Sequence, residues 1–198
     1  MRALPQSFFD RPVAELARAL LGCRIARGPV VLRITEVEAY AGPEDSASHA
    51  RFGSTERNAP MWGPPGHAYV YLCYGIHNML NVTAEAHGRA AAVLIRACEP
   101  VGGLDEIVRR RGGRAGPASL TGPGKVGAAL ELDTAWSGHP LFRRGGLTLL
   151  AGDPVARVLA GPRVGIDFAA PADRARAWRF AVAESPWVSQ RRGLELLE

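Results

Sequence analysis

The sequence contains 198 residues, of which 47% are hydrophobic, and carries a formal net charge of +5. A chain of this length can bury one sizeable hydrophobic core, so we expect a single domain over residues 1–198. No apolar run approaches the roughly 20 residues of a membrane-spanning helix, and the N-terminus lacks the apolar segment of a signal peptide. We therefore expect neither a membrane span nor a cleaved leader, and the basic charge favours an anionic partner such as nucleic acid.

The cysteines and histidines argue against disulfides and bound metals. Cys23, Cys73 and Cys98 stand among apolar residues and lack the CxxC spacing of zinc sites. Buried free thiols in a reducing compartment fit this pattern better than disulfides, so we expect a cytoplasmic protein. The five histidines form no pair at i, i+4 around a glutamate and no quartet with cysteine, so we expect no metal.

The hydrophobic pattern predicts helices and strands in mixed order. Apolar residues between 7 and 21 recur at helical spacing, with Asp10 as a candidate cap and Pro12 near the first turn. A second helix is expected over residues 103–111, and the glycine-rich stretch 112–125 is expected to form a loop. Apolar runs predict strands over residues 30–40, 67–74, 79–84, 91–97, 147–151 and 176–183. Together they predict a single α+β domain with a mostly antiparallel, curved sheet, flanking helices and a protruding β-hairpin.

The strand over residues 30–40 ends in RITEVEAY, which places two carboxylates after an apolar run. Because side chains alternate along a strand, one face is expected to carry Val30, Leu32, Ile34, Glu36, Glu38 and Tyr40. A carboxylate buried without a partner costs several kcal/mol or takes up a proton. The strand therefore either emerges into solvent at this end or delivers a catalytic acid or base to a cleft.

The stretch TGPGKVG resembles a phosphate-binding loop only in part. A P-loop needs a glycine where Ser119 stands and a serine or threonine where Val126 stands, so we expect no ATP chemistry. The turn is either merely tight, or the backbone N–H groups at Gly122 and Gly124 hold a nucleic-acid phosphate together with Lys125.

Residues 69–82 have the pattern of an antiparallel hairpin whose connection contains Tyr74 and Ile76. Hairpin tips are usually polar, whereas this tip is aromatic and aliphatic. It is therefore either buried against the core or a wedge suited to enter between stacked bases from the minor groove.

Seven segments stand out in chain order: RITEVEAYAGPEDSASHA, ERNAPMW, YVYLCYGIHNMLNV, AVLIRACEP, LTGPGKVGAAL, RVGI and SPWVS. They closely resemble the alkyladenine DNA glycosylase family, also called 3-methyladenine DNA glycosylases. The resemblance extends over most of the chain, and several segments have eight or more residues, which makes it highly specific. It implies a domain that flips a damaged purine out of duplex DNA and hydrolyses its N-glycosidic bond without metal or cofactor, leaving an abasic site.

The same resemblance assigns the catalytic residues. In EVEAY the glutamate before Ala-Tyr, Glu38, matches the carboxylate that activates the attacking water. Arg96 matches the arginine that holds this water and carboxylate, and the backbone carbonyl of Val164 is a third contact. An ionised carboxylate suits the reaction, because depurination passes through an oxocarbenium-like sugar. The resemblance gives Glu36 no role, and we expect it to be structural and paired with a nearby arginine.

The resemblance also assigns a base pocket. Tyr40, His49 and Tyr71 match the aromatic residues that sandwich the flipped base, and alkylation makes that base a cation that binds favourably over aromatic rings. Asn81 matches the residue that obstructs the 2-amino group of normal guanine. The alternative for Asn81 is a strand-end residue that caps local backbone.

The hairpin tip and the TGPGK turn are the expected DNA contacts. Tyr74 matches the intercalating tyrosine of the family, and Ile76 joins it in the wedge. Lys125, Gly122 and Gly124 are candidate contacts to the DNA backbone. The expected partner is double-stranded DNA with damaged purines, bound by a monomer.

Two other functions stay open. A glycosylase with lyase activity needs an amine to form a Schiff base, and Lys125 is the one lysine in the sequence. A non-enzymatic nucleic-acid-binding domain would use the same basic surface and hairpin. The sequence also leaves open whether 7-methylguanine, hypoxanthine and ethenoadenine are substrates besides 3-methyladenine.

Overall fold

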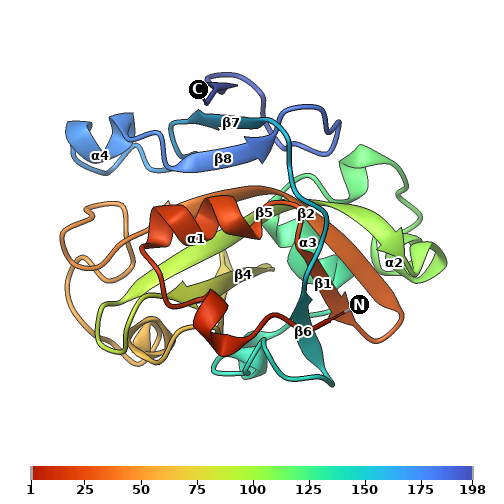
Figure 1. The fold of residues 1–198 in the computed structure, drawn as a ribbon, viewed down its shortest axis with the longest axis horizontal. Coiled ribbons are helices and arrows are strands. Elements are labelled where there is room, and N and C mark those ends of the chain that lie inside the picture. Colours follow the sequence, from red (N-terminus) through yellow and green to blue (C-terminus); the bar gives the residue numbers. More distant parts are fainter. Residues whose placement is uncertain (1, 198) are drawn as a thin grey trace.

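Antiparallel pairing joins nine strands of residues 2–197, the part of the chain that the computed structural model describes, into one sheet (Figure 1). The strands are β1 (Arg24–Arg27), β2 (Val30–Tyr40), β3 (Ala68–Cys73), β4 (His77–Ala84), β5 (Ala91–Gly102), β6 (Leu147–Leu150), β7 (Val158–Gly161), β8 (Arg179–Val182) and β9 (Glu195–Leu196). Their order is β3-β4-β5-β2-β8-β7-β9, while β1 pairs with β2 and β6. The expected α+β fold with a mostly antiparallel sheet is confirmed, although the sequence patterns do not predict β1, β7 and β9.

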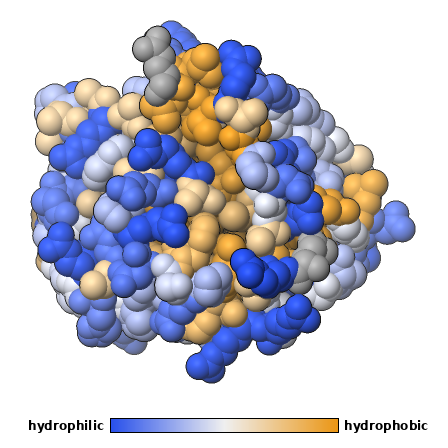
Figure 2. Space-filling model, in the orientation of Figure 1, coloured by the Kyte–Doolittle hydropathy of each residue, from blue (hydrophilic) through white to orange (hydrophobic). Residues whose placement is uncertain are grey.

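Helices flank this sheet. They are α1 (Val13–Leu20), α2 (Leu104–Arg110), α3 (Pro123–Ala129) and α4 (Pro171–Ala175), with 3-10 turns at Gln6–Phe8, Ala59–Trp62, Pro117–Ser119 and Thr134–Trp136. Figure 1 shows α1 lying across the sheet beside β8. The same face is largely hydrophilic, apart from a band of hydrophobic residues down its centre (Figure 2). None of the helices within residues 2–197 has the length and apolar character needed to traverse a bilayer.

The first helix is shorter than expected. Its apolar positions Val13, Leu16 and Leu20 keep helical spacing and are buried in the main core. However, α1 begins only after Pro12, because a proline disfavours helical conformation in the residue before it. The expected cap at Asp10 is therefore wrong, and the backbone N–H of Val13 instead donates to the carboxylate of Glu85 at 3.1 Å.

Strand β2 contains an irregularity that changes which side chains share a face. Ile34 and Val37 are three residues apart, yet both belong to the main core. Between them the register with β5 shifts on both sides of Glu36, as in a β-bulge. The expectation that Ile34 and Glu36 share one face is therefore wrong, because the bulge turns Glu36, Glu38 and Tyr40 to the opposite face.

Helix α3 starts inside the stretch that the sequence predicts as a loop. It packs directly on β4, and a Cβ atom added at Gly127 would lie 2.0 Å from the backbone oxygen of Asn78. A Cβ atom at Gly124 would lie 2.8 Å from the ring of His77. Glycine is thus used here for close approach of a helix to a strand and not for a flexible loop. The prediction of a loop over residues 112–125 is wrong for Pro123 onward.

Candidate active site

A pocket of about 440 Å³ is lined by residues of β3, β4 and β5, by the end of β2 and by the loop after β7. Seven of the side chains assigned a role by resemblance line it: Tyr40, His49, Tyr71, Tyr74, Asn81, Arg96 and Val164. Residues far apart in the sequence therefore meet around one cavity.

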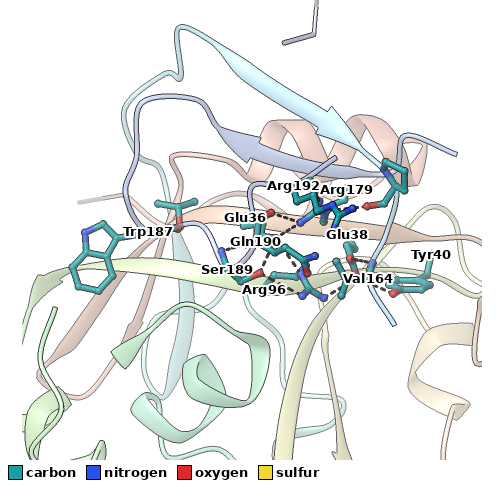
Figure 3. Close-up of polar contacts among 12 residues, drawn as sticks. Glu36, Glu38, Tyr40, Arg96, Val164, Arg179, Trp187, Ser189, Gln190 and Arg192 are labelled. Atoms are coloured by element: carbon teal, nitrogen blue, oxygen red, sulfur yellow. Dashed lines mark hydrogen bonds and ion pairs between the residues drawn. The ribbon is translucent and has the colours of Figure 1, made fainter. Parts of the chain in front are cut away.

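Glu38 is fully buried behind the wall of this pocket, and three residues that line the pocket, Tyr40, Arg96 and Val164, contact its carboxylate (Figure 3). The hydroxyl of Tyr40 donates to Oε2 at 2.8 Å, and Nη1 of Arg96 lies 3.2 Å from the same oxygen. The backbone N–H of Val164 donates to Oε1 at 2.7 Å. The contact that the structure shows for Val164 thus uses its N–H group, whereas the sequence-based expectation was a contact through its carbonyl. Together these donors hold both carboxylate oxygens in place.

Arg96 supplies a permanent positive charge beside this carboxylate. Burial alone would lower the pKa of Arg96, but the carboxylates of Glu38 and Glu36 outweigh it and raise the pKa above its ordinary value. An adjacent cation favours the ionised form of a carboxylate, which is the form that a general base requires.

Glu36 forms a second buried ionic cluster next to the first (Figure 3). Its Oε1 lies 3.2 Å from Nε of Arg96 and 3.3 Å from Nη1 of Arg179. The hydroxyl of Ser189 donates to Oε1 at 2.9 Å, and the backbone N–H of Ser189 donates to Oε2. The expectation that Glu36 pairs with a nearby arginine is confirmed. Both carboxylates of RITEVEAY are therefore buried and paired, so the possibility that this strand end emerges into solvent is excluded.

Aromatic rings form another wall of the pocket. The rings of His49 and Tyr71 meet edge to face with centroids 4.5 Å apart, and Nδ1 of His49 lies 2.9 Å from the hydroxyl of Tyr69. Burial lowers the pKa of His49 to about 4, with a further contribution from Arg57 and Arg51. The imidazole is therefore neutral at pH 7. Burial also raises the pKa of Tyr71, so its phenol stays neutral as well.

The Asn81 amide is fixed at the pocket wall. Its Nδ2 donates to the backbone oxygen of Tyr69 at 3.1 Å and to that of Met79 at 3.4 Å. Asn81 lies inside β4 and is therefore not a strand-end residue, although its side chain bonds to local backbone and also lines the cavity.

The hairpin of β3 and β4 projects its tip into solvent. Cys73 pairs with His77, and the intervening turn has positive φ at Tyr74 (51°) and Gly75 (70°). Two central residues with positive φ are typical of the type I′ turns that suit the twist of a hairpin. Tyr74 is 90% exposed and Ile76 is 72% exposed. The alternative of a tip buried against the core is therefore excluded.

The start of α3 lies beside the same pocket. The backbone N–H of Gly122 donates to the backbone oxygen of Arg96 at 3.0 Å, and Pro123 is among the lining residues. Gly122 has a φ of 140° and precedes the helix that carries Gly124 and Lys125. The TGPGK turn therefore begins at the edge of this pocket, and its contact with the DNA backbone stays a prediction.

Sequence reasoning missed several residues around the pocket. Arg57 lies 5.3 Å from the ring centroid of Tyr71, and Phe168 lines the cavity while 62% exposed. Arg163 lies 4.7 Å from the ring centroid of Tyr40 and forms a buried ion pair with Asp45. Arg57 in ERNAPMW and Arg163 in RVGI lie in segments that carry the resemblance, whereas Phe168 lies in none of them.

The chain contains three cysteines, and all three are free thiols. Over residues 2–197, no group of three or more histidine, cysteine, aspartate or glutamate side chains is arranged to hold a metal ion.

Comparisons with known proteins match nearly the whole chain. The family described as methylpurine-DNA glycosylase matches residues 7–186. A protein of Arabidopsis thaliana named DNA-3-methyladenine glycosylase is 56% identical over 191 residues, which cover 96% of this chain and 75% of that protein. A protein of Nitrosococcus oceani, provisionally named 3-methyladenine DNA glycosylase, is 59% identical over 97% of this chain and 96% of its own length.

Proposed function

Because this chain belongs to the methylpurine-DNA glycosylase family, and is therefore an enzyme that acts on DNA, we propose that it is a monofunctional glycosylase of base excision repair. In this proposal it flips 3-methyladenine and other alkylated purines out of the duplex, and water replaces the base at C1′. The family assignment sets aside the alternative of a non-enzymatic binding domain. That the enzyme works as a monomer in the cytoplasm stays a prediction.

One observation carries the proposal: the buried carboxylate of Glu38 contacts three residues that line an aromatic pocket, since Tyr40 and Val164 donate to it and Arg96 forms an ion pair with it. With its oxygens held, the ionised carboxylate orients a water molecule toward C1′ and offsets the positive charge that develops on the sugar. As the C1′–N bond breaks, the electron pair leaves with the base and the water proton passes to Glu38. General-base help of this kind is typically worth about 10² to 10⁴ in rate.

The rings of the pocket suit a cationic base. Alkylation at N3 or N7 gives the purine a positive charge, which is attracted to the faces of Tyr40 and Tyr71. His49 adds no repulsion, because its lowered pKa of about 4 keeps the imidazole neutral at pH 7. Charge thus favours the damaged base without many hydrogen bonds.

The proposal excludes a Schiff-base intermediate, and borohydride trapping tests this directly. In the presence of borohydride and methylated duplex, we expect free base to be released and no covalent protein–DNA adduct to form, because water is the nucleophile. An adduct that disappears in Lys125→Arg would instead show that the enzyme is a lyase acting through Lys125.

Asn81→Ala should raise the removal of undamaged guanine relative to alkylated adenine. The fixed amide of Asn81 occupies the pocket wall, and its loss gives room to the guanine 2-amino group. Relative excision rates from undamaged and methylated duplexes measure this change. Equal rate ratios for the variant and the unaltered enzyme would contradict the role of Asn81.

A further inference from the structure

Two lines of contacts lead from Arg179 to the proposed catalytic carboxylate. In the first, Arg179 pairs with Glu36 at 3.3 Å, Glu36 pairs with Nε of Arg96 at 3.2 Å, and Nη1 of Arg96 reaches Oε2 of Glu38 at 3.2 Å. In the second, Nε of Arg179 donates to the backbone oxygen of Pro162 at 2.9 Å. Pro162 stands two residues before Val164, whose N–H donates to Oε1 of Glu38. Contacts that start from the buried side chain of Arg179 thus lead to both carboxylate oxygens of Glu38.

The segment after β8 completes this arrangement (Figure 3). Arg179 donates from Nη1 to the backbone oxygen of Gln190 at 2.6 Å and from Nη2 to that of Arg192 at 3.0 Å. Ser189 donates to Glu36 from both its backbone and its hydroxyl. Residues 189–192 are therefore bonded to the same carboxylate and arginine that lie behind Arg96.

The charges of this cluster balance. Glu36 and Glu38 are fully buried, while the side chains of Arg96 and Arg179 are 9% and 2% exposed. Two carboxylates thus face two guanidinium groups in a site of low dielectric, where an unpaired charge is costly. The other groups near Glu38 are Tyr40 on its own strand, the N–H of Val164, Tyr71 on β3, whose pKa the charge of Glu38 helps to raise, and, over the Tyr40 ring, Arg163.

We propose that Glu36 and Arg179 are positioning residues, which aim Arg96 and Val164 at Glu38 and set the charge around it. This inference rests on the proposed function of Glu38. Glu36, the first glutamate of EVEAY, would then affect the reaction by positioning Arg96 and would not touch the reacting atoms itself.

Glu36→Gln and Arg179→Lys separate the two parts of this role. Glu36→Gln removes one negative charge beside Arg96, so the positive charge of Arg96 is less neutralised and the positive electrostatic potential at Glu38 rises. We expect single-turnover base release to fall about tenfold, as is common for partners that orient catalytic groups. The acid limb of its pH–rate profile should move to lower pH. Arg179→Lys keeps the positive charge, but an ammonium group cannot make all the contacts of the planar guanidinium with Pro162, Glu36, Gln190 and Arg192. The rate of this variant should therefore fall, while the acid limb of its pH–rate profile should not move.

Glu99→Gln is the matched control. Glu99 also forms an ion pair on the sheet, with Arg33 at 3.1 Å, and accepts from the hydroxyl of Ser185 at 3.2 Å, at the start of the C-terminal segment. Neither of these contacts involves Arg96 or Glu38, and we expect an unchanged rate and pH profile for this variant. If Glu36→Gln does not fold, Glu36→Asp replaces it, with a reduced rate and an unshifted acid limb expected.

The inference is overturned if Glu36→Gln matches Glu99→Gln in rate per folded molecule, or if its lower rate comes with an unshifted acid limb. A wild-type rate for Glu36→Asp, where that variant is used, overturns it too. Glu38→Gln, measured in parallel, separates this failure from failure of the proposed function. If Glu38→Gln is inactive while Glu36→Gln is normal, only the positioning role fails. If Glu38→Gln keeps excising bases, the catalytic assignment itself fails.

Discussion

Glu38→Gln should lower single-turnover base excision by at least about 10², since an amide cannot accept the proton of the attacking water. Binding to duplex DNA with an abasic-site mimic should stay within about tenfold, because the substitution leaves the pocket and the hairpin in place. The two measurements are a rapid-quench time course with methylated duplex and a titration with the mimic. Near-normal excision would remove Glu38 from its role.

The Glu38 variant requires a melting curve as a control. In the structure, Oε1 of Glu38 accepts from the N–H of Val164, and Oε2 accepts from the hydroxyl of Tyr40 and lies beside Arg96. The amide nitrogen of the variant replaces one of these two oxygens and will therefore face another donor. A buried donor without an acceptor costs about 1 to 3 kcal/mol. A moderate loss of stability is therefore expected, and rates are compared per folded molecule. Glu36→Gln should have the smaller effect on excision, and a reversed order would show that the two glutamates are wrongly assigned.

Tyr74→Ser should weaken binding to lesion and abasic-mimic duplexes by roughly 10- to 100-fold, because stacking of a base on an aromatic ring is worth about 1 to 3 kcal/mol. A flipped nucleotide leaves a gap in the stack, and an apolar group must fill it to stabilise the flipped state. Tyr74 stands 90% exposed on a rigid turn beside the pocket, so it is available for this contact. Titrations with lesion duplex and plain duplex measure the change.

The fold and the nonspecific affinity of the Tyr74 variant should survive. The ring makes little contact with the core, and nonspecific binding comes from basic side chains on phosphates, which weakens steeply with salt. Tyr74→Phe keeps the ring and should bind like the unaltered enzyme. A much lower melting temperature of Tyr74→Ser, with both affinities falling together, would instead mean that Tyr74 supports the fold.

Features that depend on local pattern could be predicted from the sequence. The hairpin around Tyr74 followed from alternation on both sides of a short interruption, and its position at residues 73–77 agrees with the structure. The pairing of Glu36 with an arginine followed from the cost of burying a lone carboxylate. The residues around the pocket came from resemblance, and the structure brings seven of them to one cavity.

Features that depend on distant partners could not be predicted. The bulge in β2 places Ile34 and Glu36 on opposite faces of the sheet, and it is defined by the register of β2 with β5. Ser189 and Arg179 reach Glu36 across separations of 153 and 143 residues, which no local pattern encodes. Gly124 lies in the stretch that the sequence predicts as a loop, yet it belongs to α3 and allows this helix to pack closely on His77 of β4, a contact with a residue distant in the sequence.

Product analysis with DNA that carries isotope-labelled methyl groups tests the central claim most directly. The purified enzyme should release free labelled 3-methyladenine over many turnovers, while the DNA strands stay intact until alkali cleaves them at the abasic sites. Release as a free base with an unbroken strand is the outcome of hydrolysis at C1′ by an activated water. Strand cleavage during the reaction, or tight DNA binding by folded protein with no base released, would contradict the account.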